Sequence, residues 1–331
     1  MTRRHLVTGA QGLVGRHLAA RILAADPEAM VLGIGRSART DAFFTHSIGA
    51  RPAPLPGSLT PWFESPRYRY ESIALSDGDA LRAAVAAFRP DFVFHLASAL
   101  HSAPENELVA TNVEGTASLL RAVGSSAARI VLGSSASVYG HPRRLPMDEN
   151  HPCAPVNPYG STKLAAEQLL SRRGGNLVIA RIFNVVGPGQ TEDHVCGRLA
   201  SQLARARPGA PTPVAVGPLS PTRDFIDVRD VAAALLFAAD RAAPGSIVNV
   251  ASGVETSVGE VLSALVRAAN VEIAIVERGG VAAGVGRSVA DVSRLRQLGF
   301  QPAFSIEQSL GDLVDWYRQV DAPGPGDQRG V

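Results

Sequence analysis

The feature that most constrains the fold of this chain is a turn with three glycines near the amino terminus. The turn reads TGAQGLVG over residues 8–15, after the apolar run HLVTG and before a helix predicted over 13–25. A strand, such a turn and a helix form the phosphate-binding unit of a doubly wound parallel sheet. Gly9 permits the tight turn, Gly12 the approach of a pyrophosphate, and Gly15 close packing of the helix on the strand. We therefore expect a dinucleotide cofactor to bind at Gly9, Gly12, Leu13, Val14 and Gly15.

Apolar runs and helical patterns alternate through the first half of the chain. Strands are predicted at MVLGIG, YRYESIA, DFVFHLAS and RIVLGSS, and helices at ALRAAVAAF, around ATNVEGTASLLRAV and from Tyr159. This alternation predicts a parallel sheet that is covered on both faces through right-handed crossovers. The segment 50–66 is rich in proline and glycine, and we expect it to form a long surface loop without regular structure.

The pattern loosens after residue 190. A helix is predicted over 194–207, a return to the sheet layer at DFIDVRDVAAALLFAA, a strand at IVNVAS and a helix over 258–269. The fold class expected is α/β, a Rossmann-type doubly wound parallel sheet with a smaller, partly inserted carboxyl-terminal lobe. The sheet domain would take 1–182 and 226–252, and the substrate-binding lobe 183–225 and 253–320. The Pro/Gly-rich tail 321–331 is predicted to be disordered.

Composition excludes several classes of protein. The formal net charge of +2 is too small for a nucleic-acid-binding surface. Cys153 and Cys196 are too few for a disulfide framework, and no cysteine or histidine cluster has the spacing of a metal site. No apolar run is long enough to span a membrane, and we expect no leader. These features predict a cytoplasmic protein with reduced thiols, without metal, and without nucleic-acid or membrane partners.

A tyrosine and a lysine stand four residues apart in NPYGSTKLAAEQLL, at positions 159 and 163. On a helix this spacing places both on one face. A free phenol has a pKa of about 10, and a nearby ammonium group lowers it by favouring the phenolate. Upstream, the strand end LGSSASVYG carries serine hydroxyls that can bond a carbonyl oxygen, at Ser134, Ser135 and Ser137. With the glycine turn, these residues indicate acid–base catalysis next to a nicotinamide.

Seven motifs together resemble the extended short-chain dehydrogenase/reductases that act on nucleotide-activated sugars. They cover nearly the whole chain: TGAQGLVG, HLAS, TNVEGT, SSASVYG, YGSTK, RIFNVVGPGQ and RDFIDVRDVA. The resemblance implies that Ser135 is the catalytic hydroxyl, Tyr159 the acid/base and Lys163 its partner. It also places Tyr159 and Lys163 on the cofactor, together with Leu75, Leu96, Ala97 and Asn112.

The same resemblance implies residues that bind a nucleotide-diphosphate sugar. Ser98 and Ser135 would contact the sugar, and Asn184 and Arg223 would hold the diphosphate. An arginine near the carboxyl terminus would bind the phosphates, and Arg278 is favoured over Arg287 for this role. The chain departs from the family where many relatives have an Asp-Leu pair after the third strand, because Ala74 precedes Leu75 here.

Three reactions of the family compete. Sugar 4,6-dehydratases carry an acidic pair where this chain has Ala136 and Ser137, so dehydration is disfavoured. A 4-epimerase with tightly bound NAD shares the Ser/Tyr/Lys set. The carboxyl-terminal half most resembles GDP-4-keto-6-deoxymannose reductases, which favours reduction of the C4 keto group of an NDP-4-keto-6-deoxyhexose. A non-catalytic cofactor sensor is disfavoured because Tyr159 and Lys163 are both present.

The segment GIGRSART takes the place where NAD-binding proteins usually have a carboxylate for the adenosine ribose. Gly35 would leave room for a 2′-phosphate, which Arg36, Ser37 and Arg39 could bind through charge-assisted hydrogen bonds. We therefore expect NADP(H), with NAD(H) as the alternative, and this preference favours the reductase.

Two further expectations concern the surface and the remaining reactive side chains. Apolar residues in ASLLRAV and AAEQLL could form the seam of a homodimer, as in relatives, or could face the sheet. We expect His194 to be a surface histidine, and Cys153 and Cys196 to be packing thiols.

Overall fold

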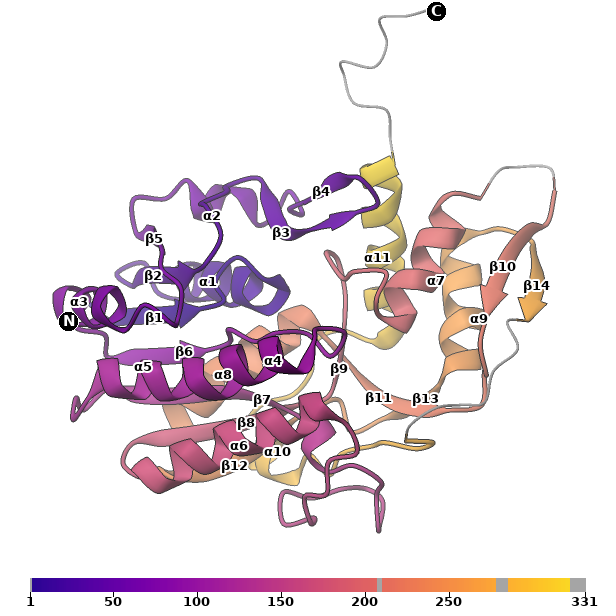
Figure 1. The fold of residues 1–331 in the computed structure, drawn as a ribbon. Helices are drawn as coiled ribbons and strands as arrows, with labels where there is room; N and C mark the ends of the chain where they lie inside the picture. Colours follow the sequence, from indigo (N-terminus) through magenta and orange to yellow (C-terminus); the bar gives the residue numbers. More distant parts are fainter. Residues whose placement is uncertain (1, 207–209, 278–284, 322–331) are drawn as a thin grey trace, which may run out of the picture.

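A parallel sheet lies at the centre of the protein, which was analysed as a computed structural model that describes residues 2–206, 210–277 and 285–321 (Figure 1). Among these residues seven strands form the sheet, in the order β12-β8-β7-β6-β1-β2-β5. Every neighbouring pair is parallel. The bounds are β1 Arg4–Thr8, β2 Met30–Gly35, β5 Tyr68–Ser72, β6 Phe92–His95, β7 Arg129–Ser135, β8 Leu177–Ile182 and β12 Ser246–Val250. The fold class expected from the sequence is confirmed.

Helices cover both faces of the sheet (Figure 1). Helices α1 (Leu13–Ala25) and α8 (Val228–Arg241) pack against each other on one face. The other face carries α3 (Gly78–Phe88), α5 (Gly115–Val123) and α6 (Pro158–Arg173). The strand order reverses between β1 and β6, which is the point where ligands bind in sheets of this type.

Alternate residues of β1 and β2 point to opposite faces of the sheet and pack in two separate apolar cores. Leu6 of β1 packs in the core under α3, α5 and α6, whereas its neighbour Val7 packs in the core under α1 and α8. Leu32 and Val31 of β2 divide in the same way. Burial of both faces explains why these strands read as continuous apolar runs in the sequence.

A second group of elements stands beside the sheet, to its right in Figure 1. Strand β11 pairs with β9 in parallel and with β13 in antiparallel orientation, and β10 pairs with β14. Helix α11 packs on α7 and α9. The bounds are β9 Asn184–Val186, α7 Val195–Ala204, β10 Thr212–Val216, β11 Thr222–Asp227, β13 Glu255–Ser257, α9 Val258–Ala269, β14 Ile273–Glu277 and α11 Ile306–Asp321. Helix α10 (Ser293–Gln297) lies instead beside β12, at the edge of the main sheet.

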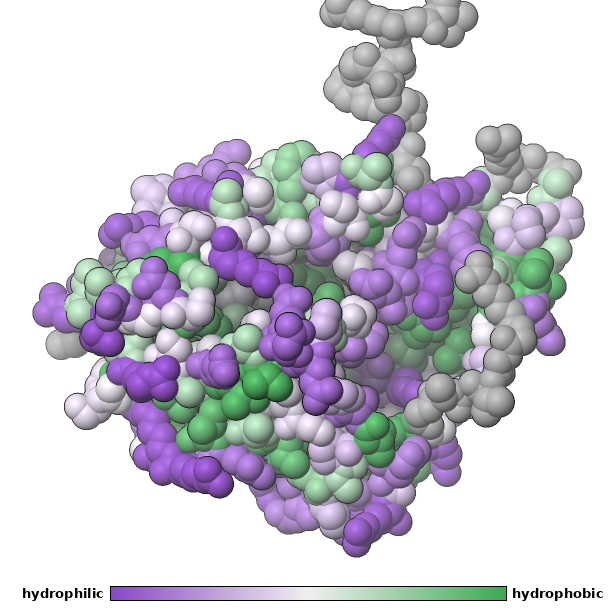
Figure 2. Space-filling view, in the orientation of Figure 1, coloured by the Kyte–Doolittle hydropathy of each residue, from purple (hydrophilic) through white to green (hydrophobic). Residues whose placement is uncertain are grey.

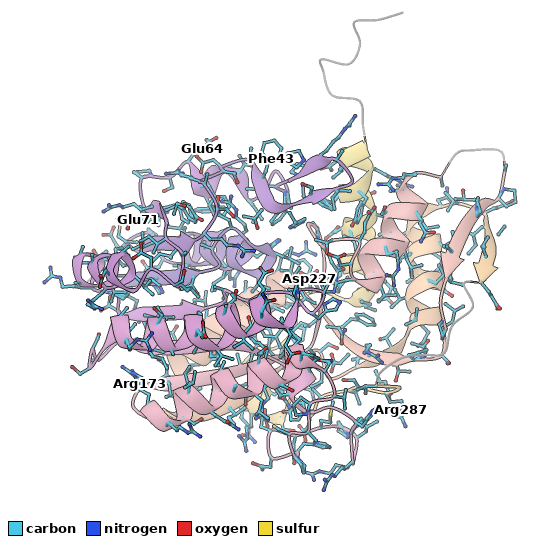
Figure 3. The ribbon with its side chains drawn as sticks, viewed as in Figure 1. Phe43, Glu64, Glu71, Arg173, Asp227 and Arg287 are labelled. Carbon is cyan, nitrogen blue, oxygen red and sulfur yellow. The ribbon has the colours of Figure 1, made fainter. Side chains whose placement is uncertain are left out.

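Asp227 lies where these elements meet the sheet, near the middle of the molecule (Figure 3). Its buried carboxylate caps α8 by accepting a 2.7 Å hydrogen bond from the backbone N–H of Arg229. The Arg229 guanidinium pairs with Asp227 and, at 2.7 Å, with Asp312 of α11. This bridge ties α8 to α11.

The expectation of an irregular loop over 50–66 is wrong. Strands β3 (Phe43–Ile48) and β4 (Arg51–Pro54) form an antiparallel hairpin, and α2 spans Thr60–Phe63. The prolines of β4 are compatible with a strand because they stand at alternate positions of an edge strand. At these positions no backbone N–H is needed for a hydrogen bond to a neighbouring strand. Apolar residues between the prolines hold the segment on the core, namely Ala53, Leu55, Leu59 and Phe63.

Two further expectations need correction. The segment predicted to return to the sheet layer begins in β11, which joins the small sheet with β9 and β13. Of this segment, only α8 packs on the main sheet. The helix expected around 110–123 starts earlier, at α4 (Glu105–Leu108), and passes through a π-helical turn, Val109–Glu114, into α5. Short π-helical turns are frequent at functional sites.

Two remaining expectations concern the chain as a whole. The tail predicted to be disordered lies, beyond Asp321, outside the described residues. Within the described part of the chain, no helix is both long enough and apolar enough to cross a membrane.

Candidate active site

A cleft of about 570 Å³ opens at the carboxyl ends of β1, β6 and β7, between the sheet and the loop before α7. Eleven of the residues predicted from the sequence line it, namely Gly9, Gly12, Leu13, Val14, Gly15, Leu96, Ser98, Ser135, Tyr159, Lys163 and Asn184. The glycine turn and the tyrosine–lysine pair therefore face the same space.

The glycine turn is shaped to accept a phosphate. Gly9 has a φ of +68°, and a Cβ there would lie 2.7 Å from the backbone nitrogen of Ala97. A Cβ on Gly15 would overlap the carbonyl oxygen of Gly9, whereas one on Gly12 would lie 3.3 Å from that oxygen. Gly12 caps α1 without a side chain, and the first turn of this helix carries no acidic residue. The first N–H groups of α1 can therefore bind an anion, and the turn fits a dinucleotide diphosphate.

Tyr159 stands in the first turn of α6. Asn157 caps this helix by accepting a 2.8 Å hydrogen bond from the backbone N–H of Gly160, which fixes the tyrosine at the cleft. The side chains of Ser98 and Ser135 line the same cleft as Tyr159. Burial raises the pKa of Tyr159, in spite of a smaller opposite influence of these two side chains, so the phenol is protonated at neutral pH.

Lys163 lies one helical turn after Tyr159, on the same side of α6. Its ammonium group is buried and donates a 2.6 Å hydrogen bond to the carbonyl oxygen of Gly133 at the end of β7. Burial lowers the pKa of Lys163 to about 8. The negative charge of Glu167 has the opposite effect and raises this pKa.

Glu167 was not predicted as part of the site, although it continues the four-residue spacing of Tyr159 and Lys163. Its carboxylate pairs with Arg181 at 2.8 Å, and both side chains are 4% exposed. Ser134 donates a 2.5 Å hydrogen bond to the same carboxylate. The four-residue spacing could have predicted Glu167 from the sequence. Its partner Arg181 could not be predicted in this way, because it comes from β8, where it stands opposite Ser134 in the sheet register.

Asn112 holds Ser98 in place. Its side-chain oxygen accepts hydrogen bonds from the Ser98 hydroxyl at 3.0 Å and from the backbone N–H of Ala99 at 2.9 Å. Its amide nitrogen donates to the hydroxyl of Thr162 on α6, at 3.0 Å. Asn112 therefore links three segments: the π-helical turn, the loop after β6, and α6. Its direct contact with the cofactor stays a prediction.

Two histidines face each other across the cleft. The ring centroids of His101 and His194 lie 5.6 Å apart, and both residues line the cavity. His194 was expected at the surface, but it is half-buried, and burial is the main cause that lowers its pKa. Cys196 is buried and its pKa is raised to about 12, which keeps it a thiol, and Cys153 is half-buried.

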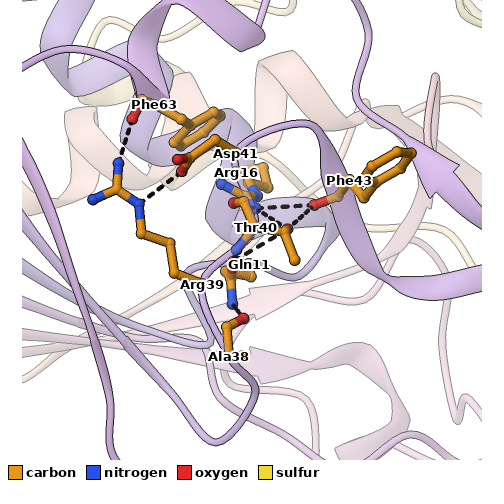
Figure 4. Close-up of polar contacts among 8 residues, drawn as sticks. All are labelled: Gln11, Arg16, Ala38, Arg39, Thr40, Asp41, Phe43 and Phe63. Carbon is orange, nitrogen blue, oxygen red and sulfur yellow. Dashed lines mark hydrogen bonds and ion pairs between the residues drawn. The ribbon is translucent and has the colours of Figure 1, made fainter.

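The loop after β2 is fixed to the glycine turn by a buried network (Figure 4). The Gln11 side-chain oxygen accepts from the backbone N–H of Thr40 at 2.6 Å and from Arg16 at 3.0 Å. Arg16 is fully buried and also donates to the carbonyl oxygen of Phe43, at 2.9 Å. The turn that fits the diphosphate and the loop after β2 are thus one rigid unit.

The two arginines predicted for a 2′-phosphate differ in their surroundings. Arg39 donates 2.8 Å hydrogen bonds to Asp41 and to the carbonyl oxygen of Phe63, and so points along its own loop (Figure 4). Arg36 forms a 3.0 Å ion pair with Glu107 of α4. Tyr70 fixes the backbone between them, since its hydroxyl donates to the carbonyl oxygen of Ser37 at 2.9 Å.

The other predicted residues lie away from the wall of the cleft. Leu75 packs against Gly115. Arg223 in β11 donates to the carbonyl oxygens of Thr222 and Gly286. Arg287 forms two hydrogen bonds with Glu255, of 2.8 and 2.7 Å, at the edge of the molecule (Figure 3). Arg278 falls outside the described residues.

No metal centre was found in the part of the chain that the structure describes. A metal ion would need three or more histidine, cysteine, aspartate or glutamate side chains close together, and none of the described residues form such a group.

Comparisons with known proteins give matches over most of the chain. Residues 5–251 match the model of the "NAD dependent epimerase/dehydratase family". The chain is 32% identical to a GDP-6-deoxy-D-mannose reductase of Pseudomonas aeruginosa, over 97% of this chain and 99% of that protein. It is 31% identical to a UDP-glucose 4-epimerase of Mycolicibacterium smegmatis, over 95% and 98% of the two chains.

A solved structure has the same arrangement of elements. The RMD protein of Pseudomonas aeruginosa, complexed with NADPH, superposes with a TM-score of 0.79 at 29% identity. The superposition covers 96% of this chain and 99% of that one.

Proposed function

The chain belongs to the NAD dependent epimerase/dehydratase family, and from that premise we propose that it reduces a nucleotide-activated keto sugar. The expectation of an NAD(P)-dependent enzyme of the extended short-chain type is confirmed by this membership. The reaction proposed is reduction of the C4 keto group of an NDP-4-keto-6-deoxyhexose with NADPH. The observation that carries this proposal is that Tyr159, Lys163 and Ser135 line one cleft together with the glycine turn.

Reduction of a ketone needs a proton donor at the carbonyl oxygen. The glycine turn would hold NADPH, which when bound would supply the hydride for the C4 carbon. Tyr159 is protonated because burial raises its pKa, and it gives its proton to the alkoxide oxygen that forms at C4. The Ser135 hydroxyl donates to the same oxygen and orients it. General acid catalysis of this kind contributes roughly 10²–10⁴ in rate.

Lys163 supports this proton transfer. Its ammonium group stabilises the phenolate that Tyr159 becomes after it has donated the proton. The carbonyl oxygen of Gly133 holds the ammonium in position at 2.6 Å. Because the charge of Glu167 raises the pKa of Lys163, the ammonium form is favoured at neutral pH in spite of its burial.

The residues at the serine-rich strand end favour reduction over dehydration. Ala136 and Ser137 follow Ser135 in a short 3₁₀ turn, Ala136–Val138. Neither side chain can act as the acid and base that would eliminate water across C5–C6. The full-length likeness to a GDP-6-deoxy-D-mannose reductase supports the same choice.

The alternative is a 4-epimerase with tightly bound NAD, and the likeness to several UDP-glucose 4-epimerases supports it. The UDP-glucose 4-epimerase of Mycolicibacterium smegmatis is 31% identical to this chain, only slightly less than the reductase. Purified protein distinguishes the two. A reductase consumes one NADPH for each 4-keto sugar reduced, whereas an epimerase keeps NAD through desalting and interconverts C4 epimers without added cofactor.

The residues that would bind the sugar nucleotide belong to the proposal as well. We propose that Asn184, at the start of β9, contacts the diphosphate from the wall of the cleft. The carboxyl-terminal elements would form the substrate lobe, with Arg223 reaching the phosphates after release from the carbonyl oxygens of Thr222 and Gly286.

We also propose that the protein forms a homodimer through the face of α5 and α6. Figure 2 shows apolar side chains gathered over these helices. Val109, in the π-helical turn before α5, and Val156, just before α6, are 38% and 47% exposed, and they line a shallow groove with Val113 and Ala165. Paired helices from two copies would bury this apolar surface.

A further inference from the structure

The carboxylate of Glu167 lies one helical turn beyond Lys163 on α6, and two side chains from the sheet hold it in place. Arg181 of β8 donates two hydrogen bonds, from Nε to one carboxylate oxygen at 3.1 Å and from Nη2 to the other at 2.8 Å. Ser134 of β7 donates a 2.5 Å hydrogen bond to the first of these oxygens. Both oxygens are therefore fixed, and water hardly reaches the pair, since both charged side chains are 4% exposed.

Arg181 is in turn held by other segments of the chain. Its Nη1 atom donates a 3.2 Å hydrogen bond to the carbonyl oxygen of Glu149, and its guanidinium carbon lies 4.8 Å from the centre of the Tyr139 ring. The Tyr139 hydroxyl donates a 2.6 Å hydrogen bond to the side chain of Asn249 in β12. The position of the Glu167 carboxylate is thus set by three neighbouring strands of the sheet as well as by α6.

Ser134 connects this buried network to Lys163. It directly follows Gly133 in β7, and the carbonyl oxygen of Gly133 accepts the 2.6 Å hydrogen bond from the Lys163 ammonium group. Side chains four residues apart on a helix are neighbours, so Glu167 also lies next to Lys163 along α6. Glu167 is therefore linked to the ammonium group in two ways, through α6 and through the end of β7.

The ammonium group of Lys163 depends on its neighbours because burial favours the neutral amine. Gly133 supplies a carbonyl oxygen but no charge. Tyr159, on the same helix, is protonated because burial raises its pKa. Burial, and to a smaller extent the charge of Lys163, lower the pKa of His95 on β6 to about 3, so this imidazole is neutral as well. Among the described residues, Glu167 supplies the charge that favours the ammonium form.

We propose that Glu167 is a positioning residue for Lys163, which fixes both the place and the charge of its ammonium group. This inference rests on the proposed function, in which that group stabilises the phenolate of Tyr159. Arg181 pairs with the carboxylate and orients it, and Ser134 ties it to the strand end whose carbonyl oxygen holds the ammonium group. An ion pair that only joined α6 to β8 would leave the titration of Lys163 unchanged, so this titration separates the two roles.

The test uses the fact that the sequence contains a single lysine. Full-length protein labelled with ¹³C,¹⁵N-lysine therefore gives one lysine side-chain signal in NMR, and its midpoint is expected at about pH 8 in the wild type. Glu167→Gln keeps the shape but removes the charge, and should lower this midpoint by about one pH unit or more, as for the loss of one neighbouring charge.

A double variant, Glu167→Gln with Arg181→Met, keeps the test open if the single variant does not fold. It removes both charges of the pair, and so leaves no unpaired buried charge. In Glu167→Gln alone, the positive charge of Arg181 has lost its partner and adds to the fall of the midpoint. The midpoint of the double variant should therefore lie between those of the single variant and the wild type.

Asp230→Asn is the matched control for loss of a buried carboxylate. Asp230 lies in α8, on the other face of the sheet, and accepts hydrogen bonds from the backbone N–H groups of Ala303 and Phe304, at 2.9 and 3.1 Å. This substitution should also destabilise the fold but leave the midpoint of Lys163 in place. A midpoint that moves in neither Glu167 variant, or that moves equally in Asp230→Asn, would overturn the positioning role.

The titration needs no sugar substrate, so it is independent of the proposed reaction. A shifted midpoint in a protein that does not reduce a 4-keto sugar keeps the positioning role and removes the reductase. An unshifted midpoint in a protein that does reduce it keeps the reductase and removes the positioning role. Where reduction is observed, the fall of kcat at high pH should move to lower pH in Glu167→Gln by the same amount as the midpoint, with KM unchanged.

Discussion

The Tyr70 hydroxyl occupies the space that a side chain at Gly35 would need, 2.8 Å from the position of its Cβ. Tyr70 comes from β5, which pairs with β2, and its hydroxyl also fixes the backbone at Ser37. Packing between these two neighbouring strands therefore leaves no space for a side chain at position 35 unless Tyr70 shifts. This packing leaves the recognition of the ribose to groups outside position 35.

Gly35→Asp tests this relationship. The new side chain would collide with the Tyr70 hydroxyl, and overpacking of this kind costs about 1–3 kcal/mol in the free energy of unfolding. Urea denaturation measures the loss. Adding Tyr70→Phe removes the hydroxyl and should recover part of the stability, although the bond to Ser37 is lost as well. A Gly35→Asp variant as stable as the wild type would show that the space is free.

Substitutions in the glycine turn should separate folding from cofactor binding. A Cβ on Gly15 overlaps the Gly9 carbonyl oxygen, so Gly15→Ala should lower the thermal midpoint because the turn must open. A Cβ on Gly12 would lie 3.3 Å from the same oxygen, a tight contact that a small shift of the turn would relieve. Gly12→Ala should therefore lower the thermal midpoint less than Gly15→Ala does, and should bind a dinucleotide about tenfold or more weakly, since the diphosphate approaches there. Calorimetry and fluorescence titration measure the two effects, and wild-type affinity in Gly12→Ala would remove the diphosphate from this turn.

The rate of the proposed reduction should depend on the charge of Lys163. Its pKa of about 8 means that the ammonium is present below pH 8 and is lost as the pH rises through that value. We expect kcat to fall above about pH 8, and Lys163→Arg, which keeps the charge, to remove this falling limb. Tyr159→Phe should lower kcat by roughly 10²–10⁴ at every pH. A wild-type rate that stays level up to pH 10 would contradict the role of Lys163.

Deprotonation of Lys163 would not unfold the protein, so unfolding caused by this lysine cannot explain the fall of kcat above about pH 8. Its pKa in the folded chain lies below the value of 10.5 for a free lysine. Between these two values the unfolded chain binds more protons at Lys163, so its contribution to stability rises with pH. Circular dichroism across the same range provides the control.

The dimer proposed through α5 and α6 should have twice the chain mass of 34.6 kDa. Replacing Val109 and Ala165 by arginine puts charge into the apolar groove and should yield a monomer in light scattering after size exclusion. Val254→Arg is the matched control, because Val254 is 59% exposed and lies in the loop before β13. A wild-type protein that is a monomer would contradict the dimer. A dimer that survives the double substitution would show that the interface lies elsewhere.

Local patterns predicted most of the sheet and part of the site. The glycine turn and the spacing of Tyr159 and Lys163 involve residues close in sequence, so their geometry follows from one turn and one helix. The hairpin at 43–54 was missed because proline content alone does not show that Ala53 packs on the core.

Contacts between distant segments explain the remaining differences. Glu107 meets Arg36 across 71 residues, and Asn112 meets Thr162 across 50. No local pattern in a single sequence shows which segments the sheet order brings together. The same limit applies to Tyr70 and Gly35, which become neighbours only because β5 pairs with β2.

The most direct test of the proposed function is the fate of a deuterium label carried at C4 of the NADPH nicotinamide. Purified protein is incubated with both C4-labelled forms of NADPH and with GDP-4-keto-6-deoxymannose or its UDP and dTDP counterparts, and the product is analysed by mass spectrometry and NMR. One deuterium at C4 of the sugar from one of the two forms, with one NADPH oxidised per product, is the result predicted. Unlabelled C4 epimers formed without net oxidation of NADPH would contradict the reductase.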